Sequence, residues 1–214
     1  MNEIPLITGP AIKAYCQRYS KTPPASTLAL SDDAQKTGRP IMMSGPFLGQ
    51  FLKMFSILLR PSRILELGTF TGYGTRCLLE GLSPTGKIYT IDNSDEWDDY
   101  AKNAFEGSGR EHNIIPLKGD ATTLIETIDE EWDLVFIDAA KRQYSTYFDQ
   151  VIPRLKKGGV ILADNVLWKG LVASDQNDKL GEGLDQFNKK VFADERVENI
   201  LIPIDDGINF IIKR

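Results

Sequence analysis

Three short apolar segments of this 214-residue sequence end in an aspartate. They are residues 86–92 (GKIYTID), 132–138 (WDLVFID) and 160–165 (VILADN), the last of which adds an asparagine after its aspartate. Such runs are typical of buried strands in a parallel sheet, whose carboxyl ends share the edge where ligands bind. We therefore expect the three aspartates to lie along one edge of a sheet.

The second and third segments place oxygen-bearing side chains at the ends of what we expect to be neighbouring strands. Because adjacent strands lie about 4.8 Å apart, Asp138 would come close to Asp164 and Asn165. Two carboxylates and an amide oxygen repel one another there unless a cation joins them, and hard cations prefer such oxygen ligands. The pattern predicts a divalent-cation site. Mg²⁺ is favoured because it leaves positions open for water or substrate, with Ca²⁺ or Mn²⁺ as alternatives.

A lysine, Lys141, lies three residues after Asp138. Most lysines are solvated on the surface, and this one is compatible with that role. Alternatively, it stands over the cation site and accepts a proton, with its pKa lowered by the nearby positive charge. The residues alone leave both interpretations open.

Residues 63–74 (RILELGTFTGYG) combine a short apolar run with three closely spaced glycines. The run predicts a buried strand, and Gly68, Gly72 and Gly74 permit a tight turn that brings the backbone close to a ligand at a helix start. The spacing G-x-x-x-G-x-G differs from the G-x-G-x-x-G of dinucleotide-binding proteins, which disfavours an NAD-dependent dehydrogenase. It resembles motif I of S-adenosylmethionine-dependent methyltransferases, although a purely structural turn is also compatible with it.

Asp92 follows the glycine turn by roughly 20 residues, the interval at which an acid can accept hydrogen bonds from both ribose hydroxyls of a nucleoside. The alternative role is to cap the next helix. The ribose role fits better because the glycine turn and this acid point to the same class of ligand.

Strand and helix patterns alternate along most of the chain, which predicts an α/β fold with a doubly wound, mostly parallel seven-stranded sheet and helices on both faces. The predicted strands are 63–67, 86–92, 113–117, 132–138, 160–165, 199–203 and 207–213. The last two form a C-terminal antiparallel hairpin around a turn at residues 205–207. The predicted helices are 10–20, 47–59, 73–82, 96–108, 121–128, 144–155 and 180–193. The glycines at 158–159 are expected to terminate the sixth helix.

The composition, with 42% hydrophobic and 26% charged residues, is that of one globular domain over residues 1–214. We expect an N-terminal helix and a mobile connector within residues 1–40, and a core over residues 41–214. The net charge of −5 and the absence of a dense basic run argue against nucleic acid as a partner. No leader and no membrane span are expected, and Cys16 and Cys77 are expected to be reduced thiols of a cytoplasmic protein.

Several segments together resemble the cation-dependent O-methyltransferases, the family of the catechol and caffeoyl-CoA O-methyltransferases, and its small bacterial members in particular. The matching segments are MMSGPFLGQFL, ILELGTFTGYGT, YTIDNSDEW, KGDA, WDLVFIDAAKRQY, LKKGGVILADNVLWKGLV and LIPIDDGINFIIK. The glycine turn, FIDAAK and ADNVLWKG are specific in combination, whereas each alone is not.

The resemblance implies roles for individual residues. Positions that hold S-adenosylmethionine in the family are occupied here by Ser44, Glu66, Gly68, Thr69, Gly74, Asp92, Ala121 and Asp138. The implied metal ligands are Asp138, Asp164 and Asn165, and Lys141 matches the catalytic base of the catechol enzymes. Substrate would be bordered by Tyr144, Trp168 and the loop 169–183. Gly74 stands where many members have a serine.

The resemblance implies transfer of a methyl group from S-adenosylmethionine to a hydroxyl of a catechol-like phenolic molecule, assisted by a divalent cation. It also implies a homodimer, for which the apolar N-terminal helices are available. Two alternatives stay open: a metal-independent small-molecule methyltransferase, and a non-catalytic module that binds S-adenosylmethionine. The N-terminal segment does not clearly match the plant enzymes that act on acyl-CoA, which speaks against a CoA-linked acceptor.

Overall fold

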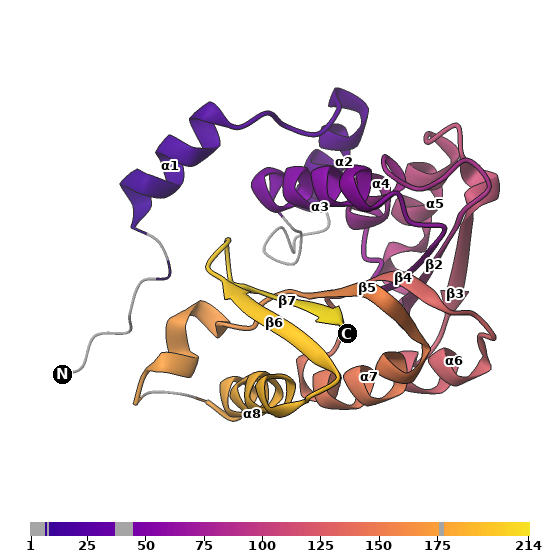
Figure 1. Ribbon diagram of the computed structural model, residues 1–214. Helices are drawn as coiled ribbons and strands as arrows, with labels where there is room; N and C mark the ends of the chain where they lie inside the picture. Colours follow the sequence, from indigo (N-terminus) through magenta and orange to yellow (C-terminus); the bar gives the residue numbers. More distant parts are fainter. Residues whose placement is uncertain (1–6, 8, 37–44, 176–177) are drawn as a thin grey trace.

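The computed structural model describes residues 7, 9–36, 45–175 and 178–214. Their centre is a seven-stranded sheet of order β3-β2-β1-β4-β5-β7-β6, with helices on both faces (Figure 1). The predicted doubly wound α/β fold is confirmed. The strand order reverses between β1 and β4, and a crevice at the carboxyl ends of these two strands is the usual ligand site of such sheets.

The strands are β1 (Arg63–Leu67), β2 (Lys87–Asp92), β3 (Ile114–Lys118), β4 (Trp132–Ile137), β5 (Leu155–Ala163), β6 (Val197–Ile202) and β7 (Ile208–Lys213). The first five are parallel, and β7 runs antiparallel to both β5 and β6. Each predicted strand is present, with its ends displaced by a few residues. β1 and β4 are buried on both faces, which explains their nearly continuous apolar sequences.

The helices pack in two layers (Figure 1). One layer contains α2 (Ala25–Lys36), α3 (Pro46–Leu59), α4 (Tyr73–Leu79) and α5 (Asp98–Glu106), and the other α6 (Ala121–Thr127), α7 (Tyr144–Val151) and α8 (Lys179–Ala193). Short 3₁₀ helices are η2 (Asp95–Trp97), η3 (Glu111–Asn113), η4 (Lys141–Gln143), η5 (Ile152–Arg154) and η6 (Trp168–Ala173). Each layer closes a hydrophobic core against one face of the sheet.

Three expectations about local structure were wrong. Residues 21–40 were expected to form a mobile connector, but α2 occupies Ala25–Lys36. Thr27 and Leu30 are buried, so a short apolar face hidden among polar residues fixes this helix against α4 and α5. The predicted helix 144–155 ends earlier, because β5 already begins at Leu155.

The glycines at 158–159 lie inside β5 instead of separating a helix from a strand. Gly158 has a φ of +76°, which glycine adopts without strain. The pairing of β4 with β5 shifts register here, between Trp132 and Leu134, so the extra residues of β5 are accommodated as a bulge.

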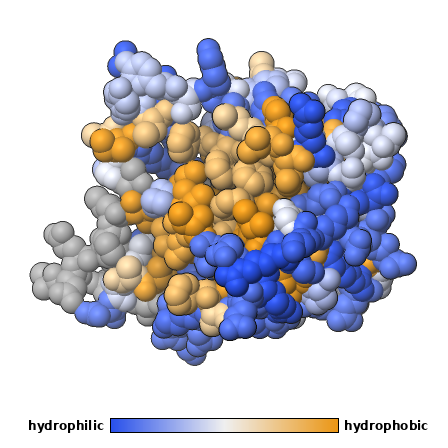
Figure 2. Space-filling model, viewed as in Figure 1, coloured by the Kyte–Doolittle hydropathy of each residue, from blue (hydrophilic) through white to orange (hydrophobic). Residues whose placement is uncertain are grey.

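The remaining helix, α1 (Pro10–Tyr19), has no buried residue. An ion pair of 2.7 Å between Lys13 and Asp205 links it to the turn before β7. Figure 2 shows apolar residues gathered over α3 and the C-terminal hairpin. The exposed large ones on these elements are Met54, Ile57, Leu58, Ile200 and Leu201. Within the described residues, every helix is too short or too polar to span a lipid bilayer.

Candidate active site

The carboxyl ends of β4 and β5 lie side by side, as predicted. The N–H of Asp138 donates to the carbonyl of Leu67 at 2.8 Å, and the N–H of Asp164 donates to the carbonyl of Ile137 at 2.9 Å. These hydrogen bonds extend the sheet ladder one residue beyond the ends of β4 and β5. They bring the side chains of Asp138 and Asp164 to one cavity of about 580 Å³.

The cavity is strongly acidic. Its lining includes five aspartates, Asp92, Asp120, Asp138, Asp164 and Asp206, but only two lysines among the described residues, Lys141 and Lys169. Such an excess of negative charge in a concave site favours bound cations or cationic groups. A sulfonium, an ammonium or a metal ion would all be stabilised here.

Asp138, Asp164, Asn165 and Lys141 all line this cavity. Asp138 receives the Lys141 ammonium on Oδ1 at 2.5 Å, and Oδ1 of Asp164 accepts the backbone N–H of Asn165 at 2.7 Å. Asn165 has a φ of +59°, a conformation that asparagine tolerates better than most residues. Across the described chain, no three His, Cys, Asp or Glu side chains are arranged to hold a metal. A cation here would therefore need the Asn165 amide as its third protein ligand.

Burial and neighbouring charges set the protonation of this group. Burial raises the pKa of Asp164 well above its usual value, the charge of Asp138 raises it further, and Lys141 lowers it. Burial lowers the pKa of Lys141, but Tyr144 and Asp138 outweigh this and raise it above its ordinary value. In this arrangement Lys141 is a charged ammonium at neutral pH, so it needs an added positive charge nearby before it can accept a proton.

Tyr144 does not border the cavity, contrary to the expectation. Its side chain is completely buried, and its hydroxyl donates to the carbonyls of Ile137 at 3.2 Å and Asp164 at 3.0 Å. The Tyr144 hydroxyl thus links the carboxyl ends of β4 and β5 by hydrogen bonds. Trp168, in η6, does line the cavity, as expected.

The glycine turn closes the other side of the cavity. Gly68 has a φ of +103°, and a Cβ there would lie 2.3 Å from the carbonyl oxygen of Asp138. Gly72 also lies in the left-handed region, at +79°, and caps the start of α4. A side chain at Gly68 would displace the end of β4, so this glycine fixes the distance between the turn and Asp138.

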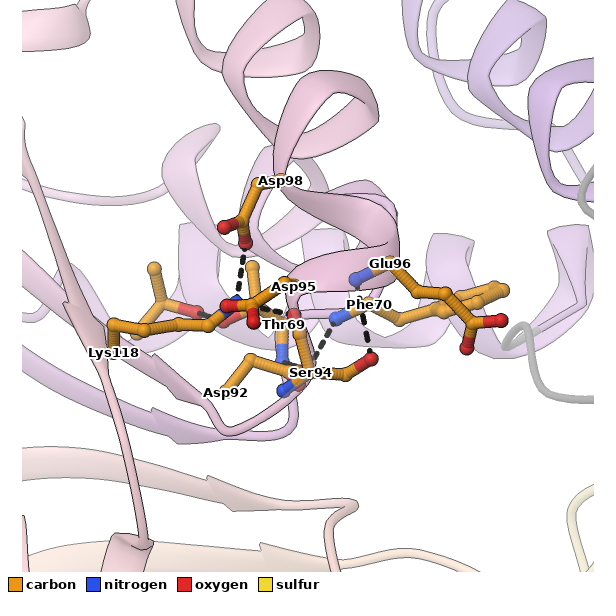
Figure 3. Close-up of polar contacts among 9 residues, drawn as sticks. Thr69, Phe70, Asp92, Ser94, Asp95, Glu96, Asp98 and Lys118 are labelled. Atoms are coloured by element: carbon orange, nitrogen blue, oxygen red, sulfur yellow. Dashed lines mark hydrogen bonds and ion pairs between the residues drawn. The ribbon is translucent and has the colours of Figure 1, made fainter.

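Asp92 joins the glycine turn to the segment after β2, as Figure 3 shows. Its Oδ2 accepts the N–H groups of Thr69 at 3.0 Å and Phe70 at 2.9 Å, and its Oδ1 accepts the N–H of Ser94 at 2.9 Å. A carboxylate offers about four acceptor positions. Three are used within the protein, which leaves a position on Oδ1 for a hydroxyl of a ligand.

Glu66 has a structural environment that the sequence did not reveal. It is fully buried, and Oε2 accepts the hydroxyls of Thr75 and of Thr90, the latter at 2.6 Å. The Thr69 hydroxyl lies 2.6 Å from that of Thr90, which links Glu66 to the glycine turn. Burial raises the pKa of Glu66 to about 7. Glu66 and Gly74 are not part of the cavity lining, whereas Thr69 lines a neighbouring cavity that shares Asp92 and Ser94 with it.

The sequence-predicted cofactor residues therefore divide into two groups. Those that line the cavity are Gly68, Asp92, Ala121 and Asp138. Those that do not line it are Glu66 in β1, Thr69 in the glycine turn and Gly74 in α4. Ser44 falls outside the described residues. The predicted metal ligands and Lys141 are brought together in one cavity.

The lining residues to which sequence reasoning gave no role include Asp120, Gln143, Tyr147 and Asp206. Asp120 caps α6 by accepting the N–H of Thr122 at 2.8 Å, and its position beside Ala121 in KGDA was an available signal. Tyr147 donates to Oε1 of Gln143 at 2.5 Å. Asp206 comes from the hairpin turn and accepts the N–H of Lys169, and no local sequence signal places this turn beside β5.

Comparison with known proteins identifies the family of this chain. The profile of the O-methyltransferase family matches residues 22–214. The chain belongs to the O-methyltransferase family. It is an S-adenosylmethionine-dependent methyltransferase by class, as the glycine turn and the family resemblance predicted.

Curated relatives agree over most of the chain. O-methyltransferase hkm8 of Aspergillus hancockii is 31% identical over 92% of this chain and 92% of its own length. A caffeoyl-CoA O-methyltransferase of Populus kitakamiensis is 33% identical over 75% of this chain and 73% of its own length.

Solved structures share the whole fold. Podospora anserina methyltransferase PaMTH1, solved with SAH bound, has a TM-score of 0.87 at 26% identity and covers 95% of this chain and 94% of its own. The O-methyltransferase from Bacillus cereus, also in complex with SAH, has a TM-score of 0.86 at 25% identity over 95% of this chain and 97% of its own.

Proposed function

We propose that this O-methyltransferase transfers the methyl group of S-adenosylmethionine to one hydroxyl of a vicinal diol on an aromatic ring, and that a divalent cation, Mg²⁺ in the first instance, takes part. The observation that carries the proposal is the meeting of Asp138, Asp164, Asn165 and Lys141 in one cavity beside the glycine turn. Oxygen ligands from two neighbouring strands, with a lysine above them, suit a hydroxyl acceptor better than a nitrogen or carbon acceptor.

The donor set fits a hard divalent cation. Asp164 is only 3% exposed, and burial and the charge of Asp138 raise its pKa more than Lys141 lowers it, so a further cation would stabilise its charged form. Asp138, Asp164 and the amide oxygen of Asn165 would hold the ion. When bound, the cation would supply positive charge that polarises both diol oxygens and offsets the carboxylate charges that raise the pKa of Lys141.

The chain's own residues then have distinct tasks. Lys141 accepts the proton of the attacking hydroxyl as the new O–CH₃ bond forms and the bond from sulfur to the methyl carbon breaks. Gly68 and Asp92 hold the donor by close backbone approach and by the remaining acceptor position of Asp92. Trp168 covers the acceptor side, held by the hydrogen bond of 2.9 Å from its Nε1 to Asp178.

The charge of the cavity also bears on the acceptor. Several relatives are named caffeoyl-CoA O-methyltransferases, so a CoA thioester is one possible acceptor class. CoA carries several phosphates, whereas five of the ionisable side chains lining this cavity are aspartates. We infer that the acceptor is a small free phenolic diol.

A metal-independent small-molecule methyltransferase is the second candidate. The ion pair of 2.5 Å between Lys141 and Asp138 favours this candidate, because the lysine ammonium already balances the charge of one carboxylate. In that case the two aspartates would only order the strand ends, and activity would not respond to a chelator.

We also propose that the protein is a cytoplasmic homodimer. The free thiols of Cys16 and Cys77 support a reducing compartment. The apolar surface over α3 and the C-terminal hairpin supports contact with a second copy, since its exposed side chains would be buried there (Figure 2).

The deciding experiment measures methyl transfer from labelled S-adenosylmethionine to catechol, to caffeoyl-CoA and to a phenol with a single hydroxyl. Each reaction is run with added Mg²⁺ and with an excess of chelator. We expect transfer to catechol only, and only with the metal. Asp164→Asn should lose this activity while Asp99→Asn, on the exposed face of α5, retains it. Equal transfer to catechol in chelator would remove the metal from the proposal and favour the second candidate.

A further inference from the structure

Lys118 is the last residue of β3 and pairs with Asp92, the last residue of β2. Paired residues of adjacent strands project from the same face of a sheet. The Lys118 ammonium therefore reaches the segment that follows Asp92. It donates to the carbonyl oxygen of Ser94 and contacts the carboxylates of Asp98 at 2.6 Å and Asp95 at 3.0 Å (Figure 3).

Ser94 is consequently held from two directions. Its N–H donates to Oδ1 of Asp92, and its carbonyl accepts from Lys118. Asn93 and Ser94 line the cavity next to Asp92. The conformation of residues 93–98 thus determines one wall of the cavity and the direction of the free acceptor position on Asp92.

We propose that Lys118 is a positioning residue for S-adenosylmethionine, which holds residues 93–98 in the conformation that completes the cofactor wall. The inference rests on the proposed function only in requiring that the chain binds S-adenosylmethionine. Lys118 does not line the cavity that holds Asp138, but it lines a neighbouring cavity that shares Asp92 and Ser94 with it. We expect it to act through Ser94 and the two aspartates.

The charge of the segment explains why a cation is needed there. Residues 95–99 (DEWDD) contain four acids, and Asp92 precedes them. Without a nearby cation these carboxylates would repel one another and Asp92, which would open the segment. Slight burial lowers the pKa of Lys118, but hydrogen bonds to Asp98 and Asp95 raise it above its ordinary value, so the ammonium stays charged.

The contacts are solvent-exposed, since the side chain of Asp95 is 92% accessible. Exposed ion pairs contribute little to global stability, and salt screens them. Their effect should therefore appear in the local order of residues 93–98 and in cofactor affinity, and hardly at all in the unfolding temperature.

The test is titration calorimetry of the full-length protein with SAH, the methyl-transfer product, on four forms: wild type, Lys118→Met, Lys118→Arg and Lys189→Met. Lys189 is the matched control, an exposed lysine on α8 that also forms an ion pair, with Asp185 at 2.7 Å, and lines neither cavity. Removing the charge of Lys118 should raise Kd about three- to tenfold. Lys118→Arg should restore most of the affinity, and Lys189→Met should resemble wild type.

Two further measurements separate positioning from general stability. With S-adenosylmethionine saturating, kcat and the KM of the acceptor should be unchanged in Lys118→Met. Added NaCl should weaken SAH binding by the wild type and leave the variant nearly unaffected. An unchanged Kd in Lys118→Met, or an equal rise in Lys189→Met, would overturn this inference alone. Failure of the wild type to bind SAH would overturn the proposed function together with it.

Discussion

The ammonium of Lys141 lies 2.5 Å from Oδ1 of Asp138, and these side chains are only 18% and 17% exposed. The pair joins the residue assigned to proton transfer with one of the residues assigned to the cation. Each partner stabilises the charge of the other, so the lysine keeps its proton for as long as Asp138 has no other cation. The protonation of Lys141 thus depends on what else Asp138 binds.

Replacing Lys141 should remove catalysis without removing cofactor binding. Lys141→Met should lower kcat by about 10²- to 10⁴-fold, the contribution of a positioned proton acceptor. Lys141→Arg should be equally inactive, because a guanidinium keeps its proton at all relevant pH values. The measurements are kcat with a catechol acceptor and the Kd of SAH. Lys157→Met, on an exposed position of β5, serves as the control. An active Lys141→Arg enzyme would show that the lysine only supplies charge.

Stability should fall as the pH rises because of Glu66. Its folded pKa of about 7 exceeds the ordinary value of 4.5, so the folded protein holds this proton more tightly than the unfolded chain. The contribution is complete below pH 4.5 and is lost as the pH rises through about 7. At about 1.4 kcal/mol per pH unit, the loss amounts to roughly 3 kcal/mol.

The comparison for this prediction is urea unfolding of wild type and Glu66→Gln over that pH range, without ligand. Glutamine stays neutral, so the free energy of unfolding of the variant should not show this loss. As the pH rises, the variant should therefore become more stable relative to the wild type by roughly 3 kcal/mol. Glu131→Gln, an exposed glutamate, should follow the wild type. A difference between Glu66→Gln and wild type that is independent of pH would contradict the assignment.

Substitution of Gly74 should depend on whether the new side chain can donate a hydrogen bond. A Cβ at Gly74 would lie 2.6 Å from Oε1 of Glu66, and this oxygen has no hydrogen-bond partner within the described part of the chain. Gly74→Ala should be destabilising because it crowds this oxygen. Gly74→Ser should lower the free energy of unfolding by about 1 kcal/mol less than Gly74→Ala does, because the serine hydroxyl can donate to Oε1 of Glu66. Thermal unfolding of both variants tests this, and equal losses would argue against a hydrogen bond.

Disruption of the apolar surface should dissociate the proposed dimer. Leu58, on α3, is 80% exposed, and a glutamate there would be buried without a partner in any contact between copies through this surface. We expect Leu58→Glu to be monomeric in light scattering coupled to size-exclusion chromatography. Phe192→Glu alters a side chain that is 82% exposed on α8, across the sheet, and should leave the assembly intact. Identical masses for wild type and Leu58→Glu would exclude this surface from the interface.

Features that depend on neighbouring residues in the sequence could be predicted well. Asp138 and Asp164 end two apolar strands, and strand ends of a parallel sheet meet at one edge whatever the remainder of the chain does. Lys141 follows Asp138 by three residues and begins the 3₁₀ helix η4, so its approach to the same site is also a local matter.

Features that depend on tertiary packing could not be predicted from the sequence. Asp206 reaches the cavity only because β7 inserts between β5 and β6, and the sequence around it indicates nothing more than a hairpin turn. The helix α2 was not predicted for the same reason. It packs against α4 and α5, and its own sequence is only weakly apolar. The burial of Tyr144 depends on carbonyls of two different strands.

The insertion of β7 also fixes the order in which the protein can acquire its activity during synthesis. Gly207 and Asp206 accept hydrogen bonds from Val166 and Leu167, so the wall of the cavity after β5 takes its final form only when the hairpin has docked. β7 is the last of the seven strands to leave the ribosome. The strands that carry Gly68 and Asp92 are therefore synthesised before the segment that completes the wall after β5.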